Sequence, residues 1–303
     1  MQVLDVVAVG EVLWDIIGAE AHLGGAPFNF AAHCCQLGAR SAIVSRVGRD
    51  ELGDRVLARA GELGVDASLI QCDAEHPTGR VRVTFDAEGQ PAFDICTEVA
   101  YDYLAATPEA VARVAKADVV CFGTLAQRHP SARQSIAELL DAAQRALLVC
   151  DLNLRPPHYT PEVVRDALSR CCLLKLNEAE VRVVQAMLEC EELDEDAFLL
   201  HLLQACDLEL ACVTLGAQGC ILRTRRERVV SPGYACEVVD TIGSGDAFAA
   251  ALVVKYREGC PLTEVADFAN LVGAYVATQR GATPFINPDA LQAFAVQTQR
   301  SST

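Results

Sequence analysis

Long hydrophobic runs and positive charge are both scarce in this sequence of 303 residues. No segment approaches the roughly 18 consecutive apolar residues that a membrane-spanning helix needs, and the first residues lack the basic start of a signal peptide. The 25 lysines and arginines are outnumbered by 41 acidic residues, which gives a formal net charge of −16. Binding to nucleic acid or to an anionic membrane requires a basic face, so we expect neither as a partner.

Motifs for metal clusters and for one class of nucleotide binding are also missing. The 14 cysteines form no C-x-x-C pair, and several lie inside apolar runs, as Cys121 does. We therefore interpret them as reduced, small buried residues, which are typical of the cytoplasm. The pattern G-x-x-x-x-G-K-[ST] is absent, which excludes a P-loop enzyme with its phosphate-binding lysine.

Short apolar runs alternate along the chain with longer amphipathic segments. This alternation predicts a single α/β domain, residues 1–303, with a mostly parallel sheet and helices on both faces. The predicted strands are 6–9, 41–47, 119–124, 147–151, 173–176 and 210–215. The predicted helices are 27–37, 52–63, 108–115, 132–145, 161–169, 178–188, 195–204, 246–258, 262–279 and 288–297. Ligands of such sheets usually bind at the carboxyl ends of the strands.

Two segments break this alternation. Residues 78–86 alternate in polarity, turn at 87–90 and resume at 91–96, as in an antiparallel hairpin. A shorter insert at 14–23 precedes two glycines. We interpret both, at about 14–24 and 78–99, as a lid over the ligand site, although an edge hairpin would have the same pattern. A further hairpin at 219–230 carries four arginines, which we expect to form a solvated edge.

The stretch Asp240-Thr241-Ile242-Gly243-Ser244-Gly245-Asp246 joins a glycine-rich turn to an apolar helical run. Its glycines permit a tight turn and leave backbone amides uncovered at a helix N-terminus, where an anion binds readily. An aspartate there would compete with the anion. Asp246 is understandable if it removes a proton from a nucleophile that attacks a phosphate held by those amides. The alternative is an ordinary glycine-rich loop with an acidic residue near the helix start.

Four motifs, in order along the chain, resemble those of the ribokinase-like, or PfkB, family of carbohydrate kinases nearly end to end. The stretch at 240–246 resembles the C-terminal signature, with Ser244 where alanine is more usual. The other three matches are Gly24-Gly25-Ala26-Pro27-Phe28-Asn29-Phe30-Ala31 to the N-terminal signature, Lys175-Leu176-Asn177-Glu178-Ala179-Glu180 to the N-x-x-E element, and Val213-Thr214-Leu215-Gly216-Ala217-Gln218-Gly219 to the nucleotide-binding strand and turn. The resemblance implies a three-layer α/β/α ribokinase-like fold with a small β-strand lid.

The resemblance also implies roles for individual residues in a reaction that uses ATP. Asp246 would be the base, and the amides of Gly243, Ser244, Gly245 and Asp246 would hold the migrating phosphoryl group. Asn177 and Glu180 would organise Mg²⁺, largely through water, although both residues also suit a plain helix N-terminus. The nucleotide would be bound by Asn177, Thr214, Gly216, Gly219 and Asn270. A monovalent cation such as K⁺ would be bound by Asp240, Ile242 and Gly281.

The expected sugar contacts lie in the N-terminal half. Asp15 can accept bonds from two vicinal hydroxyls, Gly24 and Gly25 would let a sugar ring lie against bare backbone, and Asn29 offers a donor and an acceptor. Arg155 and Arg128 each follow a predicted strand at the ligand edge. Either could face a substrate carboxylate or the developing phosphate charge, and we favour Arg155 for such a place.

Within the family the chain is most similar to the fructokinases, through Gly10-Glu11-Val12-Leu13-Trp14-Asp15 and Asp151-Leu152-Asn153-Leu154-Arg155. The second stretch also resembles the 2-keto-3-deoxygluconate kinases. The resemblance therefore implies an ATP-dependent fructokinase, with a 2-keto-3-deoxygluconate kinase or a nucleoside kinase as alternatives. A catalytically silent sugar or nucleotide sensor is the alternative outside the enzymes. The family implies a homodimer through the lid, while the short first lid segment is equally compatible with a monomer.

Overall fold

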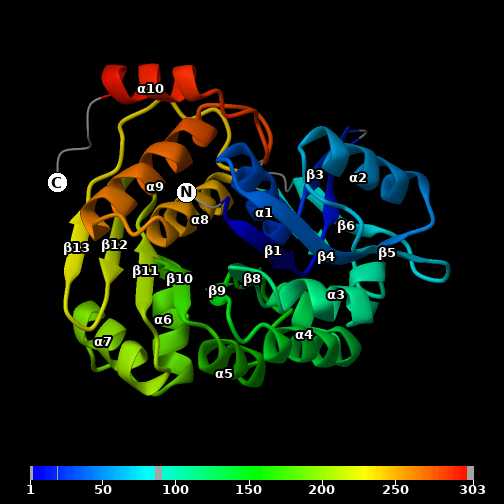
Figure 1. The fold of residues 1–303 in the computed structure, drawn as a ribbon, viewed down its shortest axis with the longest axis horizontal. Coiled ribbons are helices and arrows are strands. Elements are labelled where there is room, and N and C mark those ends of the chain that lie inside the picture. Colours follow the sequence, from blue (N-terminus) through cyan, green and yellow to red (C-terminus); the bar gives the residue numbers. More distant parts are fainter. Residues whose placement is uncertain (1–2, 19, 86–90, 299–303) are drawn as a thin grey trace.

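A nine-stranded sheet runs through the middle of the molecule (Figure 1). The computed structural model describes residues 3–18, 20–85 and 91–298, and the strand order of this sheet is β13-β12-β11-β10-β9-β8-β1-β4-β5. Neighbours from β11 to β5 run parallel, whereas β12 and β13 are antiparallel at one edge. The strands are β1 (Asp5–Val9), β4 (Arg40–Gly48), β5 (Ile70–Asp73), β8 (Val119–Phe122), β9 (Leu147–Asp151), β10 (Leu173–Asn177), β11 (Leu210–Thr214), β12 (Cys220–Arg223) and β13 (Arg228–Ser231).

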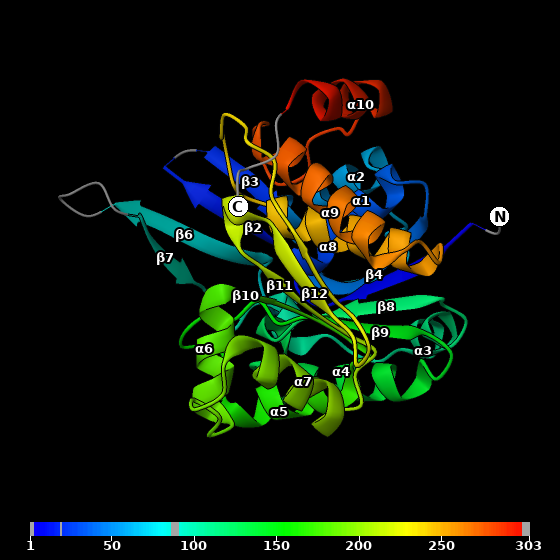
Figure 2. The ribbon, with the colours of Figure 1, turned by 90° about the vertical axis from the view of Figure 1, so that its left-hand side faces the viewer.

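Helices cover both faces of this sheet, so that the body has three layers (Figure 2). One layer contains α1 (Ala26–Gln36), α2 (Glu51–Glu62), α8 (Ser244–Arg257), α9 (Leu262–Ala277) and α10 (Pro288–Gln297). The other contains α3 (Pro108–Val114), α4 (Pro130–Ala142), α5 (Pro161–Arg170), α6 (Glu178–Met187) and α7 (Glu195–Ala205). Short 3₁₀ turns lie at η1 (Ala100–Tyr103), η2 (Leu125–Gln127) and η3 (Gly216–Gln218).

The central strands supply both hydrophobic cores because successive side chains of a strand point to opposite faces. Val7 and Val9 of β1 pack in the core that contains the residues of α3 to α7. Val6 and Ala8 pack in the core under α1, α8 and α9. Near-continuous apolar strands of this kind are typical of a parallel sheet that is buried on both faces.

A second, four-stranded sheet projects from one side of the body (Figure 2). Its order is β3-β2-β6-β7, with β2 (Leu13–Ile17), β3 (Glu20–Gly24), β6 (Gly79–Phe85) and β7 (Pro91–Ile95). The two inserts found in the sequence therefore join into one sheet, because β2 pairs in parallel with β6. The predicted turn at 87–90 lies outside the described residues.

The predicted elements correspond closely to the observed ones. Each predicted strand and helix has a counterpart, and β5, which is only four residues long, is the strand of the central sheet that the prediction lacks. Helix α8 begins at Ser244, two residues before the predicted start. The arginine-rich hairpin is the edge pair β12–β13. Arg223 and Arg228 form ion pairs with Asp196 of α7, and Arg225 with Asp207.

The cysteines agree only in part with the expectation of small buried residues, because half of them are not buried. All 14 cysteines are free, and seven of them are buried. Among the described residues, no helix combines the length and the apolar character that crossing a membrane demands.

Candidate active site

Helix α8 begins directly after Gly243, which has a left-handed backbone conformation with φ 77°. A Cβ at this position would lie 2.1 Å from the carbonyl oxygen of Ala282, so only glycine fits. The amide and the hydroxyl of Ser244 both donate to the carbonyl of Thr241. The amides of Gly245 and Asp246 have no acceptor within the helix, as is usual in a first helical turn. We call residues 243–246 the anion loop.

The carboxylate of Asp246 lies beside these open amides. Its Oδ2 accepts a hydrogen bond of 2.7 Å from Nδ2 of Asn29, which α1 brings alongside α8. Burial and, after it, the nearby charge of Asp151 raise the pKa of Asp246 to about 6, while Lys175 and the Asn29 bond oppose the shift. At neutral pH the group is therefore mostly ionised and still able to take up a proton near a bound anion.

A buried ion pair that the sequence analysis did not single out lies under the anion loop. Nζ of Lys175 is 2.9 Å from each carboxylate oxygen of Asp151, and the two side chains are 10% and 8% exposed. The signal was present in the sequence, because Lys175 interrupts one apolar strand and Asp151 ends another. It was not interpretable there, because pairing requires knowing that β9 and β10 are neighbours.

The expected sugar contacts gather between the second sheet and the start of α1. A carboxylate oxygen of Asp15, on β2, is 2.8 Å from the position that a Cβ on Gly24 would occupy. Gly25 caps α1 with φ 107°, and a Cβ there would be 2.6 Å from the carbonyl oxygen of Glu11. Gly25 therefore sits where only bare backbone fits, whereas a side chain on Gly24 would have to displace the carboxylate of Asp15. Burial raises the pKa of Asp15, and the charge of Arg155 counteracts it.

Arg155 faces the carboxylates of this site. Its positive charge lowers the pKa of Asp15, Glu11 and Asp246 together, and its side chain is exposed, without a hydrogen bond to the described residues. Arg155 is therefore a cation without a hydrogen-bonded partner among the described residues, within electrostatic range of Asp246.

Glu11 is a second group that the sequence analysis left without a role. The residue is 3% exposed, and its Oε2 has no hydrogen-bond partner among the described residues. Burial and the charge of Asp246 raise its pKa to about 7, against the attraction of Arg155 and Arg128. A second carboxyl group that titrates near neutral pH therefore lies within electrostatic range of Asp246.

Asn177 and Glu180 form a capping box at the start of α6. Oδ1 of Asn177 accepts from the amide of Glu180, and Oε2 of Glu180 accepts from the amide of Asn177. Oε1 of Glu180 accepts a 2.7 Å bond from the amide of Leu154 and so ties down the loop that carries Arg155. Each oxygen has a lone pair left for a water molecule, which fits indirect binding of a metal. The described residues contain no cluster of three or more His, Cys, Asp or Glu that could hold a metal directly.

The predicted nucleotide residues lie around the turn after β11. Thr214 is the register partner of Asn177 at the carboxyl ends of β10 and β11. Gly216 and Gly219 have φ 58° and φ 100°, and a Cβ on Gly219 would be 2.0 Å from the carbonyl oxygen of Ser231. Asn270 of α9 is buried, and its Nδ2 donates to the carbonyls of Ser231 and Pro232. Asn270 thus connects α9 to the end of β13, a tie that the sequence did not predict.

The three residues predicted for a monovalent cation are joined by the carboxylate of Asp240. Oδ1 accepts from the amide of Ile242 and Oδ2 from the amide of Gly281, both at 3.0 Å. This arrangement fixes the start of the anion loop against the segment after α9.

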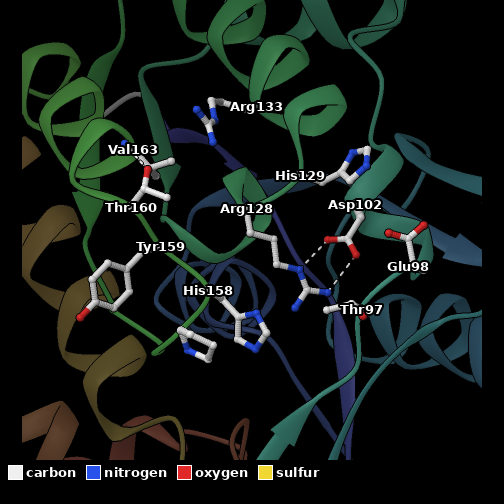
Figure 3. Close-up of a pocket in the computed structure, with 11 residues that line it drawn as sticks. Thr97, Glu98, Asp102, Arg128, His129, Arg133, His158, Tyr159, Thr160 and Val163 are labelled. Atoms are coloured by element: carbon white, nitrogen blue, oxygen red, sulfur yellow. Dashed lines mark hydrogen bonds and ion pairs between the residues drawn. The ribbon is translucent and has the colours of Figure 1, made fainter.

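Arg128 does not share the position of Arg155. Its Nε and Nη2 donate to Asp102, and Nη2 also donates to the carbonyl of Cys96. The guanidinium lies 5.0 Å from the ring of Tyr101. Figure 3 shows this pair at a cavity of about 280 Å³ lined from η1, the start of α4 and the loop before α5. These bonds hold the side chain of Arg128 at the base of the second sheet.

Comparison with known proteins gives a consistent result. A family model described as pfkB family carbohydrate kinase matches residues 5–290. Fructokinase-1 of Oryza sativa subsp. japonica is 30% identical over 306 residues, which cover 92% of this chain and 93% of that protein. A putative sugar kinase of Pyrococcus horikoshii is 28% identical over 297 residues, 91% of each chain.

Solved structures share the fold. The structure of the Pyrococcus horikoshii sugar kinase superposes with a TM-score of 0.81 at 28% identity, over 95% of this chain and 96% of that one. The same protein has also been solved in complex with ATP. The fructokinase of Xylella fastidiosa with bound ATP gives a TM-score of 0.87 at 22% identity, over 96% and 98% of the two chains.

The anion loop generates a first prediction. Gly243→Ala should lower the free energy of unfolding by several kcal/mol, because it adds backbone strain of about 1–3 kcal/mol and a clash with Ala282. Gly64→Ala is the matched control, since Gly64 has φ 75° but open space around its Cβ position. Urea unfolding measures both variants. Equal losses at the two positions would show that the loop is not sterically constrained.

The burial of Glu11 generates a second prediction. Its pKa is about 7 in the folded chain and 4.5 for the ordinary group, so the folded state binds more protons between these values. Stability therefore falls as pH rises through this window, by about 3 kcal/mol in total. Glu11→Gln removes this titration, so its stability relative to the native chain should improve by that order from pH 4.5 to pH 8. Urea unfolding at several pH values tests this, and a constant difference would contradict it.

Proposed function

Because the chain belongs to the pfkB family of carbohydrate kinases, we propose that it is a fructokinase, which transfers the γ-phosphoryl group of ATP to fructose and makes fructose 6-phosphate. The sugar kinase activity itself follows from the family. Fructose as the acceptor is supported by the rice fructokinase, the relative at 30% identity. The observation that carries the chemistry is Asp246, held by Asn29 beside open amides of a helix N-terminus.

Asp246 acts as the general base. Its carboxylate takes the proton of the attacking sugar hydroxyl as the bond to phosphorus forms. Asn29 donates to Oδ2 and so keeps Oδ1 oriented for this transfer. A pKa of about 6 leaves it ionised at neutral pH without making it a very weak base.

The anion loop holds the phosphoryl group during transfer. The amides of Gly243, Gly245 and Asp246 donate to no acceptor among the described residues, whereas that of Ser244 donates to the carbonyl of Thr241. Open amides and the dipole of α8 stabilise the negative charge that the migrating group carries. Phosphoryl transfer depends mainly on such positioning and charge stabilisation, so this loop can serve where a P-loop is absent.

The sugar lies between the second sheet and α1. Asp15 accepts hydrogen bonds from two hydroxyls, and the ring rests on Gly24 and Gly25. In this proposal the second sheet is a lid, and its closure excludes water and suppresses hydrolysis of ATP. A homodimer through the lid strands is the family arrangement that we extend to this chain.

ATP occupies the carboxyl ends of β10 and β11, along Thr214, Gly216 and Gly219, with Asn177 and Asn270 nearby. The ATP complex of the Pyrococcus horikoshii relative supports this donor. Asn177 and Glu180 would hold Mg²⁺ through water, and the ion would neutralise phosphate charge. Asp240, Ile242 and Gly281 would bind K⁺ beside the anion loop.

A 2-keto-3-deoxygluconate kinase is the nearest competing function, and Arg128 weighs against it. A carboxylate substrate calls for a second cation in the sugar pocket, yet Arg128 is ion-paired with Asp102 and only 8% exposed. A nucleoside kinase and a silent sensor remain as alternatives that activity measurements separate.

Substrate preference is the direct test. We expect ADP release to be fastest with fructose in a panel of ketoses, aldoses, 2-keto-3-deoxy acids and nucleosides, with and without K⁺. A higher kcat/KM for several other sugars would overturn fructose and leave the kinase assignment intact. Absence of ADP release with every compound, together with measurable sugar binding, would favour the sensor.

Asp246 generates a prediction on rate and on pH. Asp246→Asn should lower kcat on the order of 10²–10⁴-fold with nearly unchanged binding of ATP and sugar. In the native chain, kcat/KM should fall as pH drops below about 6, because protonation of Asp246 removes the base. Asp289→Asn, an acid in the first turn of α10, is the control and should change neither. Near-native turnover of Asp246→Asn would exclude this role.

A further inference from the structure

The ion pair of Lys175 and Asp151 is placed by strand register on the α8 side of the sheet. The two residues are register partners on β10 and β9. Alternation puts Asp151 on the same side as Val149, and Lys175 on the same side as Leu173, and both apolar residues belong to the core under α8. Asp151 is the last residue of β9 and Lys175 is the middle residue of β10, so the pair lies toward the edge of the sheet where the proposed phosphoryl transfer takes place.

Nζ of Lys175 lies directly under the anion loop. It is 3.4 Å from the position that a Cβ on Gly245 would occupy. Two of its N–H groups go to Asp151, and the third has no acceptor among the described residues. The ammonium stays charged in spite of its burial, because Asp151, Asp246 and Glu180 raise its pKa.

Stability alone does not account for such a pair. Two charges buried in an apolar sheet are often no more stabilising than well-packed apolar residues of similar size. Phosphoryl transfer, by contrast, gains from a fixed positive charge in a site of low dielectric. The chain lacks a P-loop lysine that would provide one.

We propose that Lys175 is a positioning residue for the reaction: fixed by Asp151 beneath Gly245, its ammonium places a permanent positive charge under the loop that receives the phosphoryl group. The inference rests on the proposed role of that loop and of Asp246. Lys175 acts through both, since it supports the charge held by the loop amides and keeps Asp246 ionised. Asp151 fixes the position of Lys175 and at the same time repels Asp246.

The groups that face Asp246 come from several elements. They are Asn29 of α1, Glu11 after β1, Asp151 of β9, Arg155 of the following loop and Lys175 of β10. Removing Lys175 or Asp151 leaves the other groups in place. The two removals should therefore change the titration of Asp246 in opposite directions.

Three variants test the inference through the pH dependence of kcat/KM. The acid limb is the fall of kcat/KM at low pH that reports protonation of Asp246. Lys175→Met should shift this acid limb to higher pH. It should also lower the plateau value of kcat on the order of 10- to 100-fold, which is less than the loss for a donor that touches the phosphoryl group. Asp151→Asn should shift the acid limb to lower pH. Lys175→Arg should restore part of the rate. Lys255→Met, which neutralises a partly buried lysine at the far end of α8 that is paired with Glu258, is the control and should match the native chain.

The double variant Lys175→Met/Asp151→Asn guards against simple misfolding, because it contains no unpaired buried charge. We expect it to unfold at a temperature at or above that of the native chain, with an acid limb near the native one and a kcat that stays as low as in Lys175→Met. Native turnover by this stable variant would show that the pair is only structural and would overturn the inference. Acid limbs that shift in the same direction in the two single variants would overturn it as well.

These outcomes differ from a failure of the proposed function. If the native chain released no ADP with any sugar, the function would fail before any variant was made. If the native chain is active and Asp246→Asn is not, full activity of the double variant removes the role of Lys175 alone.

Discussion

Charge balance at the carboxyl edge of the central sheet is the constraint on which the rest of the site depends. Burial raises the pKa of Asp246, Glu11 and Glu180, and an isolated buried carboxylate would simply take up a proton. Each is compensated to a different degree. Glu180 has two backbone amides, Asp246 has the amide of Asn29 together with the charge of Lys175, and Glu11 has an oxygen without a partner. These differences suit different tasks. Glu180 holds two loops in place through its hydrogen bonds, while the pKa of Asp246 stays close to the value that the proposed base needs at neutral pH.

The register of the parallel strands places the charged residues that make up this balance. Because side chains alternate along a strand, a slip of one residue would turn Lys175 away from α8 and toward the opposite core. Leu174 and Leu176, its neighbours, are buried in that opposite core and oppose such a slip. The apolar packing of β10 therefore does more than stabilise the sheet, since it also fixes a charge beneath the anion loop. The start of α8 is fixed just as firmly, because Gly243 has no room for a side chain beside Ala282.

The sequence predicts the features of this arrangement that depend on local patterns. Prediction from the sequence fails for contacts that depend on the order of the strands in the sheet. Periodicity located each helix, because apolar faces at helical spacing are read within one segment. Glycines located the anion loop, since a tight turn before an apolar helix has a local signature. The pairing of Lys175 with Asp151 was not predictable, because it joins residues of two strands whose adjacency appears only in the folded sheet. The hydrogen bond from the amide of Leu154 to Glu180 and the ion pair of Arg128 with Asp102 were not predicted for the same reason. The local motifs were thus predicted from the sequence, whereas the hydrogen-bond and ion-pair partners of their side chains were not.

The same charges bear on the choice of substrate. On the sugar side of Asp246, the exposed Arg155 is a single cation that faces Asp15, Glu11 and Asp246. Lys175 is already neutralised by Asp151, and Arg128 by Asp102. Three carboxyl groups therefore share one cation that has no hydrogen-bonded partner among the described residues. In the proposed site, a substrate carboxylate would add a further acidic group beside these carboxyl groups, whereas a neutral sugar would find acceptors for its hydroxyl groups. These charges are the physical reason for proposing an uncharged sugar rather than a sugar acid as the acceptor, and this reason does not depend on the likeness to fructokinases.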